Sequence, residues 1–183
     1  HQVINYQKYR FAYRSITGNT NERTMVCTIL PRNVFYGHSL NSVKRGSEYF
    51  NNHEMLYFTA VMSSFVIDFS LRQSVGTQLT MFYVYQTPVP RLCKGDQFFD
   101  AIVERAAKLI CTTPEFDDLA QEAGLGSHKS GVTNEVQRAR LRAELDGMIA
   151  HIYGLTEEEF TYILSTFPLV SEPVKVAARN AYR

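Results

Sequence analysis

The stretch YRFAYRSITGNTNERTMVCTILPR, Tyr9–Arg32, carries the clearest structural pattern in the first half of the chain. Residues 9–16 are rich in β-forming side chains that partly alternate in polarity, so they predict a strand. The polar residues 17–21 are typical of a turn, and residues 24–31 predict the returning strand. A proline, which has no amide hydrogen to donate, closes that strand. The sequence therefore predicts a hairpin that leaves Arg23 between the turn and the second strand.

A helix and a further strand are predicted to follow the hairpin. Residues 33–52 predict a short strand and then a polar loop. Apolar residues next recur with i, i+3, i+4 spacing, which predicts a helix over about 53–73 with Asn52 as its N-cap. Residues 78–90, QLTMFYVYQTPVP, predict a strand that two prolines close. The apolar run Met81–Tyr85 predicts that this strand is buried on both faces.

The second half of the chain has a helical pattern. Asp96 is the predicted cap of one helix, and Thr113-Pro114 predicts the start of a shorter one. A longer helix is predicted over about 136–153. Thr156 and Glu159 have the spacing of a capping box for the last helix, and a frayed, basic tail is expected after it.

These patterns predict an α+β protein with two domains. The first is a small mixed α/β domain over residues 1–92, and the second is an all-helical domain over residues 93–183. The boundary between them is predicted near residues 90–96, where prolines interrupt the pattern.

Composition narrows the class of protein. The chain has 183 residues, of which 45% are hydrophobic and 20% charged, as in ordinary globular proteins. No apolar run approaches the roughly 20 residues of a membrane span, so we expect no membrane segment and a cytoplasmic location. Cys27, Cys93 and Cys111 lack disulfide or zinc-like spacing, which predicts reduced thiols that serve packing. The first residue is His1, so we expect a processed chain or a piece of a longer protein.

The sequence lacks the common catalytic motifs. It has no glycine-rich loop for a nucleotide or S-adenosylmethionine, no Gly-x-Ser-x-Gly and no His-Glu-x-x-His. The carboxylate runs at 115–118 and 157–159 fall in first turns of predicted helices, where they favour the helix dipole. Asp68 is predicted to pair with Arg72 four residues later, or to orient an arginine if it is buried. We therefore expect no catalytic residue, no metal site and no bound cofactor in this chain.

Charge is distributed unevenly along the chain. Residues 1–92 carry a net charge of +5 and residues 93–183 a net charge of −4, although the whole chain carries only +1. Arg, Lys, Asn, Gln and Thr are the residues that grip phosphates and read base edges. Several lie near predicted strand ends in the first half, and they form the candidate DNA-binding set: Arg10, Arg14, Asn21, Arg23, Arg32, Lys44, Arg45, Arg72, Gln73, Thr77 and Gln78. A solvated sheet edge is the alternative reading of this pattern.

Long phrases of the sequence resemble a known family. YRSITGNTNERTMVCTILPRNVFYGHSL, NNHEMLYFTAVMSSFVIDFSLRQSVGTQLTMFYVYQTPVP, FFDAIVERAAKLICTTPEFDDLAQEAGLG and LRAELDGMIAHIYGLTEEEFTYIL are similar to the carboxy-terminal region of large bacterial adenine-specific DNA methyltransferases. That family includes type IIG restriction–modification enzymes and the methyltransferases of bacteriophage-exclusion systems. The segment over 51–90 also resembles, more loosely, the target recognition domains of type I specificity subunits.

The resemblance implies a role in recognising a DNA target. In the family, a separate amino-terminal domain carries the S-adenosylmethionine loop and an Asn-Pro-Pro-Tyr-type motif, and neither occurs here. The chain is thus expected to bind double-stranded DNA while the catalytic domain of the same polypeptide flips and methylates the adenine. The runner-up is a structural module that docks the catalytic domain or a partner subunit and binds little DNA itself. A self-contained enzyme is the third reading.

Overall fold

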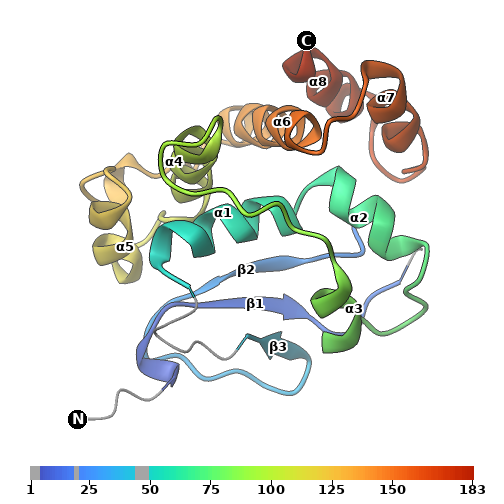
Figure 1. The fold of residues 1–183 in the computed structure, drawn as a ribbon. Coiled ribbons are helices and arrows are strands. Elements are labelled where there is room, and N and C mark those ends of the chain that lie inside the picture. Colours follow the sequence, from blue (N-terminus) through green and yellow to red (C-terminus); the bar gives the residue numbers. More distant parts are fainter. Residues whose placement is uncertain (1–4, 19–20, 44–49) are drawn as a thin grey trace.

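The computed structural model describes residues 5–18, 21–43 and 50–183. Its sheet has three antiparallel strands in the order β2-β1-β3, with β1 at Arg10–Arg14, β2 at Cys27–Leu30 and β3 at Leu40–Ser42. In β1, Phe11 lies opposite Ile29 of β2. The predicted hairpin is therefore confirmed, and β3 is the short strand expected after it (Figure 1).

Helices make up most of the remaining chain, so the α+β class is confirmed. Three single turns of 3-10 helix lie at Asn5–Gln7, Pro114–Phe116 and His128–Ser130. The α-helices are α1 Asn52–Met62, α2 Phe65–Arg72, α3 Met81–Gln86, α4 Phe99–Ile110, α5 Asp117–Glu122, α6 Glu135–Ile152, α7 Glu157–Ser165 and α8 Glu172–Tyr182.

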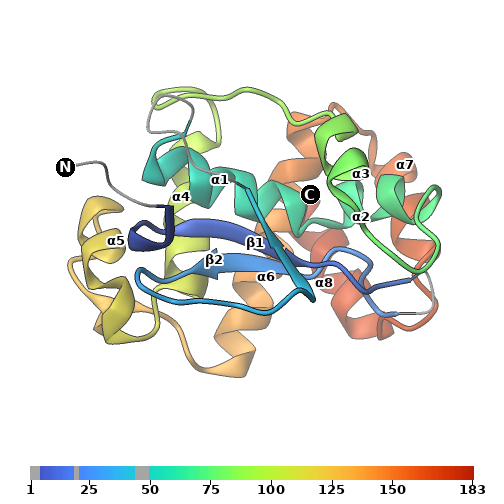
Figure 2. The ribbon, with the colours of Figure 1, turned by 90° about the horizontal axis from the view of Figure 1, so that it is seen from below.

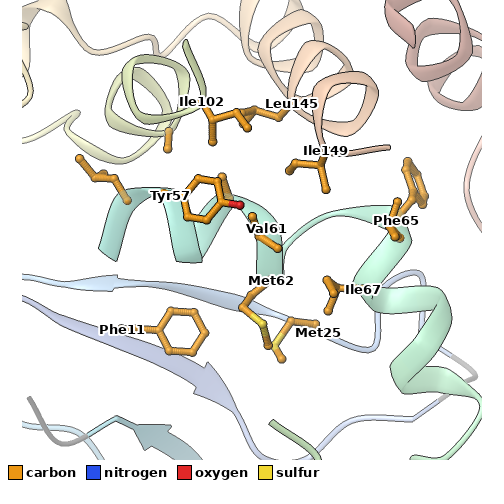
Figure 3. Packing of buried hydrophobic residues seen from close by; sticks show 14 of the residues in the cluster. Phe11, Met25, Tyr57, Val61, Met62, Phe65, Ile67, Ile102, Leu145 and Ile149 are labelled. Carbon is orange, nitrogen blue, oxygen red and sulfur yellow. The ribbon is translucent and has the colours of Figure 1, made fainter. Parts of the chain in front are cut away.

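The elements form three layers that share one core. α1 lies between the sheet on one side and α4 and α6 on the other (Figures 1 and 3). Phe11 of β1 meets Phe58 of α1 edge-on at 4.8 Å between ring centroids, and Tyr57 of the same helix lies 5.3 Å from Phe99 of α4. The buried hydrophobic cluster runs without interruption from Tyr9 in the first half to residues of α8. The predicted domains 1–92 and 93–183 thus share a hydrophobic core, and the boundary between them stays a prediction.

The other side of the sheet carries no helix in the view of Figure 2, where the segment between β2 and β3 runs across it. No single helix in the described part of the chain is long and apolar enough to cross a membrane; only α1 and α2 taken together pass such a test, and they are bent by 60°.

The predicted helix over 53–73 is wrong in one respect, because it is broken into α1 and α2. Ser63 donates its hydroxyl to the Thr59 carbonyl at 2.9 Å, and Ser64 starts α2 by accepting from the Ile67 amide at 3.4 Å. Two consecutive serines compete for backbone partners and allow the chain to turn there. The N-cap of α1 is Asn51, one residue before the predicted one, in a capping box with Glu54.

The predicted strand over 78–90 is also wrong, because its apolar run forms helix α3. Only Gln78 makes a sheet-like bridge, opposite Ile16. Phe82 and Tyr85 are 62% and 73% exposed, where burial on both faces was expected. Periodicity cannot separate a short apolar strand from a short helix, and here the helix is the outcome.

Two predictions at helix ends need correction. Asp96 does not cap α4, because its carboxylate accepts from the Cys93 amide at 2.6 Å, and α4 begins after Phe98 in a left-handed conformation. The residues expected to form a frayed tail instead form α8, which packs against α6. The capping box of Thr156 with Glu159 is confirmed at the start of α7.

Candidate nucleic-acid interface

The structure divides the candidate DNA-binding residues between the two ends of β1. Arg10 and Arg32 lie at its start, where Arg10 is paired with the last residue of β2. A larger group lies around its end: Arg14, Asn21, Arg23, Arg72, Gln73, Thr77 and Gln78. Lys44 and Arg45 lie outside the residues that the structure describes.

The two arginines at the start of β1 make intramolecular contacts. Arg10 is only 4% exposed, donates to the Val34 carbonyl, and lies with its guanidinium 5.3 Å from the ring centroid of Tyr36. Arg32 pairs with Asp118 of α5 at 2.5 Å and lies 4.6 Å over the ring of Tyr9. Arg10 is therefore covered, whereas Arg32 ties the end of β2 to α5.

Arg23 lies between two buried carboxylates that come from different helices. Its guanidinium nitrogens are 3.8 Å from Oδ2 of Asp68 in α2 and 3.6 Å from Oδ2 of Asp146 in α6. Its Cζ stacks 3.4 Å from the ring centroid of Phe65. The residue that the sequence placed beside the hairpin turn thus joins the α/β half of the chain to the helical half.

Arg72 lies on the other side of the same cluster. Its guanidinium is 4.0 Å from Oδ2 of Asp68, which confirms the predicted pair, and 4.0 Å from the ring centroid of Phe167. Its Nη2 also donates to the carbonyls of Asn21 and Glu22, both at 3.3 Å. The side chain is 7% exposed, so Arg72 holds the loop between the hairpin strands and presents little of its charge to solvent.

Burial controls the ionisation of this cluster. Desolvation raises the pKa of Asp146 to about 6, against the opposing effects of Arg23 and of the Phe65 amide. Desolvation also raises the pKa of Asp68, although two arginines and two backbone amides favour its charged form. Both carboxyl groups therefore remain harder to ionise than in water, even with arginine beside them.

Apart from Arg32, the exposed candidates among the described residues gather at the end of β1. The segments 14–17 and 77–79 run together there, with the Leu79 amide donating to the Ser15 carbonyl at 2.8 Å and the Thr17 amide to Thr77 at 3.2 Å. We call this region the β1-end surface and define it by exposed residues of these segments, of the end of α2 and of α3: Arg14, Ile16, Gln73 (the C-cap of α2), Thr77, Gln78, Phe82 and Tyr85. Figure 1 shows α3 next to the end of β1.

Asn21 borders this surface. In the amide orientation that satisfies its neighbours, Oδ1 of Asn21 accepts from Nη2 of Arg14 at 3.1 Å and from the Gly18 amide at 3.3 Å. Its backbone amide donates to the Gly18 carbonyl at 3.1 Å. The contact places an amide and an exposed guanidinium side by side, which is a pair that suits hydrogen-bonding to bases and phosphates.

The electrostatics of this end of the molecule are nearly balanced. Asp68 lies against Arg23 and Arg72, and Asp146 also faces Arg23. Arg14 is thus the exposed arginine of the β1-end surface.

Sequence reasoning missed three residues that shape this region. Phe82 and Tyr85 were predicted inside a buried strand, and their exposure appears only once α3 is a helix. Asp146 was overlooked within an amphipathic helix, although it stands three residues from both Ala143 and Ile149 on the buried face. An acid on the apolar face of a predicted helix is the signal that would have identified it.

A cavity of about 630 Å³ is lined by residues of β1, α1, α3 and the segment that follows α3, and Tyr85 of the β1-end surface is one of them. Its walls are mostly apolar and include Phe11, Phe50 and Phe58, and the segment 87–93 forms one edge. Of the candidate residues, Arg10 lines it. Within the described residues, no group of three or more His, Cys, Asp or Glu side chains is arranged to hold a metal ion.

Comparisons with known proteins found no matching family model, no matching curated protein and no matching solved structure.

Proposed function

We propose that the chain is the DNA target-recognition module of an adenine-specific DNA methyltransferase of the restriction–modification type. The observation that carries the proposal is the β1-end surface, where exposed Arg14 and three exposed amide or hydroxyl side chains lie beside two exposed aromatic rings. The resemblance of the sequence to the carboxy-terminal region of those enzymes supports it. By itself the module carries out no reaction; S-adenosylmethionine binds to the catalytic domain elsewhere in the parent polypeptide.

Each type of residue on the β1-end surface has a role in this proposal. Arg14 grips a phosphate or reads guanine, and Gln73 and Gln78 read adenine through paired hydrogen bonds. Phe82 and Tyr85 have aromatic rings on which bases can stack, or which can insert between two neighbouring base pairs. Lys44 and Arg45 remain proposed phosphate anchors.

The geometry also divides the candidate arginines by role. Arg10, Arg23, Arg32 and Arg72 make contacts within the protein, so we assign them to support of the interface. Replacing them with alanine would disturb the fold as well as any contact with DNA. Arg14 is consequently the residue whose change tests the proposal most directly.

The test is duplex binding by the Arg14→Ala variant. Loss of one phosphate contact is expected to weaken binding and to lower the slope of log K against log salt by about one unit. Fluorescence anisotropy with labelled duplexes over a range of salt concentrations measures both quantities. A sequence-dependent loss of about 1–3 kcal/mol would instead assign Arg14 to a base.

The matched control is Arg140→Ala, which removes the same charge from an 81% exposed side chain on α6. The control is expected to bind as the wild type does. Equal binding by both variants and the wild type would show that the exposed charge of the β1-end surface makes no contact with DNA, and would reject the proposal.

A second function is favoured by a different observation. The helical half exposes large apolar side chains, with Val136 79%, Tyr162 64% and Leu169 59% exposed. These residues would suit docking of the catalytic domain or of a partner subunit. Stoichiometric capture of a separately expressed catalytic domain, lost in Tyr162→Ala and Leu169→Ala and kept in Arg14→Ala, is the result expected of this role.

A further inference from the structure

The loop between the hairpin strands is held by a side chain from α2. We call residues 21–25 the recognition loop. Asp68 accepts from the Thr24 amide at 2.9 Å and from the Met25 amide at 3.2 Å. Thr17 closes the loop from its other side, because its hydroxyl donates to the Thr24 carbonyl at 2.7 Å. Together with the bonds from Arg72, these contacts fix the loop backbone at both ends.

The helical half reaches the same loop through Asp146, and the ring of Phe167 also lies 5.7 Å from the Arg23 guanidinium. Asp146 of α6 is 5% exposed, and its Oδ1 accepts from the Phe65 amide at 2.8 Å at the start of α2. Its other oxygen faces Arg23 of the recognition loop at 3.6 Å. Asp146 therefore contacts both α2, which holds the loop backbone, and a side chain of the loop itself.

Stability alone is a poor explanation for this pair of acids. Burial disfavours the charged form of each carboxyl, as the raised pKa of each shows. Nη1 of Arg23 is buried and has no hydrogen-bond partner among the described residues. A buried ion pair that is incompletely satisfied contributes little net stability, whereas it does favour one arrangement of the groups around it.

We propose that Asp68 and Asp146 are positioning residues for the recognition loop, so that the helical half sets the geometry with which Asn21 and Arg14 meet DNA. The expected effect on DNA binding rests on the proposed function, whereas the positioning of the recognition loop does not depend on it. It makes the helical half a part of the recognition surface and not a separate attachment.

The experiment is hydrogen–deuterium exchange of the whole chain, wild type against Asp146→Asn. Asparagine keeps the size of the side chain and an acceptor for the Phe65 amide, but it removes the charge that faces Arg23. The Thr24 and Met25 amides are expected to exchange at least tenfold faster in the variant, while core amides of α4 keep their wild-type rates.

Glu144→Gln is the control. It lies on the same helix, two residues earlier, and removes an ion pair with Arg105 of α4 that measures 2.7 Å. Its exchange rates in the recognition loop are expected to equal those of the wild type. Accelerated exchange in both variants would mean that α6 is merely loosened, which overturns the inference.

A second variant keeps the test decisive if Asp146→Asn unfolds. Arg23→Met removes the charge from the loop side and retains the length of the side chain, and it must loosen the same two amides. Unchanged exchange at Thr24 and Met25 in a folded Arg23→Met variant also overturns the inference.

Duplex binding by the same proteins separates the inference from the proposed function. Asp146→Asn is expected to weaken binding, and its effect is expected to be non-additive with that of Arg14→Ala. A wild-type chain that binds no duplex rejects the proposed function, yet the exchange rates still decide whether Asp146 positions the loop.

Discussion

At the scale of single residues, the arginines of the first half differ in what surrounds them. Residue type made Arg10, Arg14, Arg23 and Arg72 equivalent candidates, but of these four only Arg14 is exposed, and the exposed Arg32 is paired with Asp118. The other three meet carbonyl groups, carboxylates or aromatic rings of the protein. The difference arises from contacts between residues far apart in the chain, which no local pattern records.

Asp146 gives a prediction about pH. Its folded pKa of about 6 lies above the ordinary value of 3.8, so the folded state binds a proton that the unfolded state releases between those values. This group therefore contributes stability that is present below about pH 4 and is lost as the pH rises through 6. The change amounts to about 3 kcal/mol for a shift of roughly two units.

Urea unfolding of the wild type and of Asp146→Asn at several pH values measures that change. The variant lacks the titrating group, so the stability of the wild type relative to the variant is expected to fall from pH 4 to pH 7. A difference that stays constant, or that rises with pH, would show that Arg23 fully compensates the burial of Asp146.

Gly147, the neighbour of Asp146, gives a prediction about packing. A Cβ at this position would lie 2.7 Å from the backbone carbonyl of Ala181 in α8, and backbone atoms cannot move away without shifting the helix. Gly147→Ala is therefore expected to destabilise the protein by about 1–3 kcal/mol. Gly76→Ala, where a Cβ would meet nothing within 4 Å, is the control in the same thermal unfolding assay. Equal stability of the two variants would contradict close packing of α8 on α6.

At the scale of elements, α3 is where expectation and structure differ most. Its apolar residues were assigned to a buried strand, but the segment forms a short helix between the bridge at Gln78 and the prolines that follow. Phe82 and Tyr85 are three residues apart and both exposed. α3 thus adds aromatic surface next to the polar candidates and no strand to the sheet.

The double variant Phe82→Ala/Tyr85→Ala tests the role of α3. Exposed side chains contribute little to the core, so the unfolding free energy is expected to change by less than about 0.5 kcal/mol per residue. Loss of base stacking is expected to weaken DNA binding by about 1–3 kcal/mol per ring that stacks. Tyr162→Ala on α7, which is 64% exposed, is the control. Unaltered affinity in the double variant would remove α3 from the interface.

The elements also show how far the sequence alone could be used. The hairpin, the capping box of Thr156 with Glu159 and the pair of Asp68 with Arg72 were predicted because each depends on neighbours within a few residues or on a turn. The break at Ser63 and Ser64 left the apolar spacing unchanged, so periodicity did not reveal it. The cluster of Arg23 with Asp146 joins residues more than a hundred positions apart, and only the tertiary structure brings them together.

Across the whole molecule, the two halves differ in composition, but they share one hydrophobic core. Net charge and helix content both change near residue 92, which is why the sequence predicts a boundary there. The structure nevertheless packs Phe65 of α2 against Phe167 beyond α7, with 4.8 Å between ring centroids. A change in charge and helix content along a chain therefore need not mark two units that fold separately.

Truncation tests this directly. A fragment of residues 1–92 would expose the faces of α1 and α2 that α4, α6 and the segment after α7 cover, so it is expected not to unfold cooperatively. Circular dichroism during urea titration is the measurement, with the whole chain as control. A sharp, two-state transition of the fragment would establish 1–92 as an independent domain.

Under the proposed function, the pairing of Arg23 with Asp146 has a consequence for the exchange of DNA specificity between related chains. A chimera that grafts residues 1–92 of this chain onto a foreign helical half would deliver Arg23 to a helix without a matching acid. The grafted arginine would then be partly buried without one of its two counter-charges, and its loop would lose one of its contacts. Under the proposed function, a graft must therefore carry α6 with the hairpin, or restore an acid at the position of Asp146, to keep Arg23 paired.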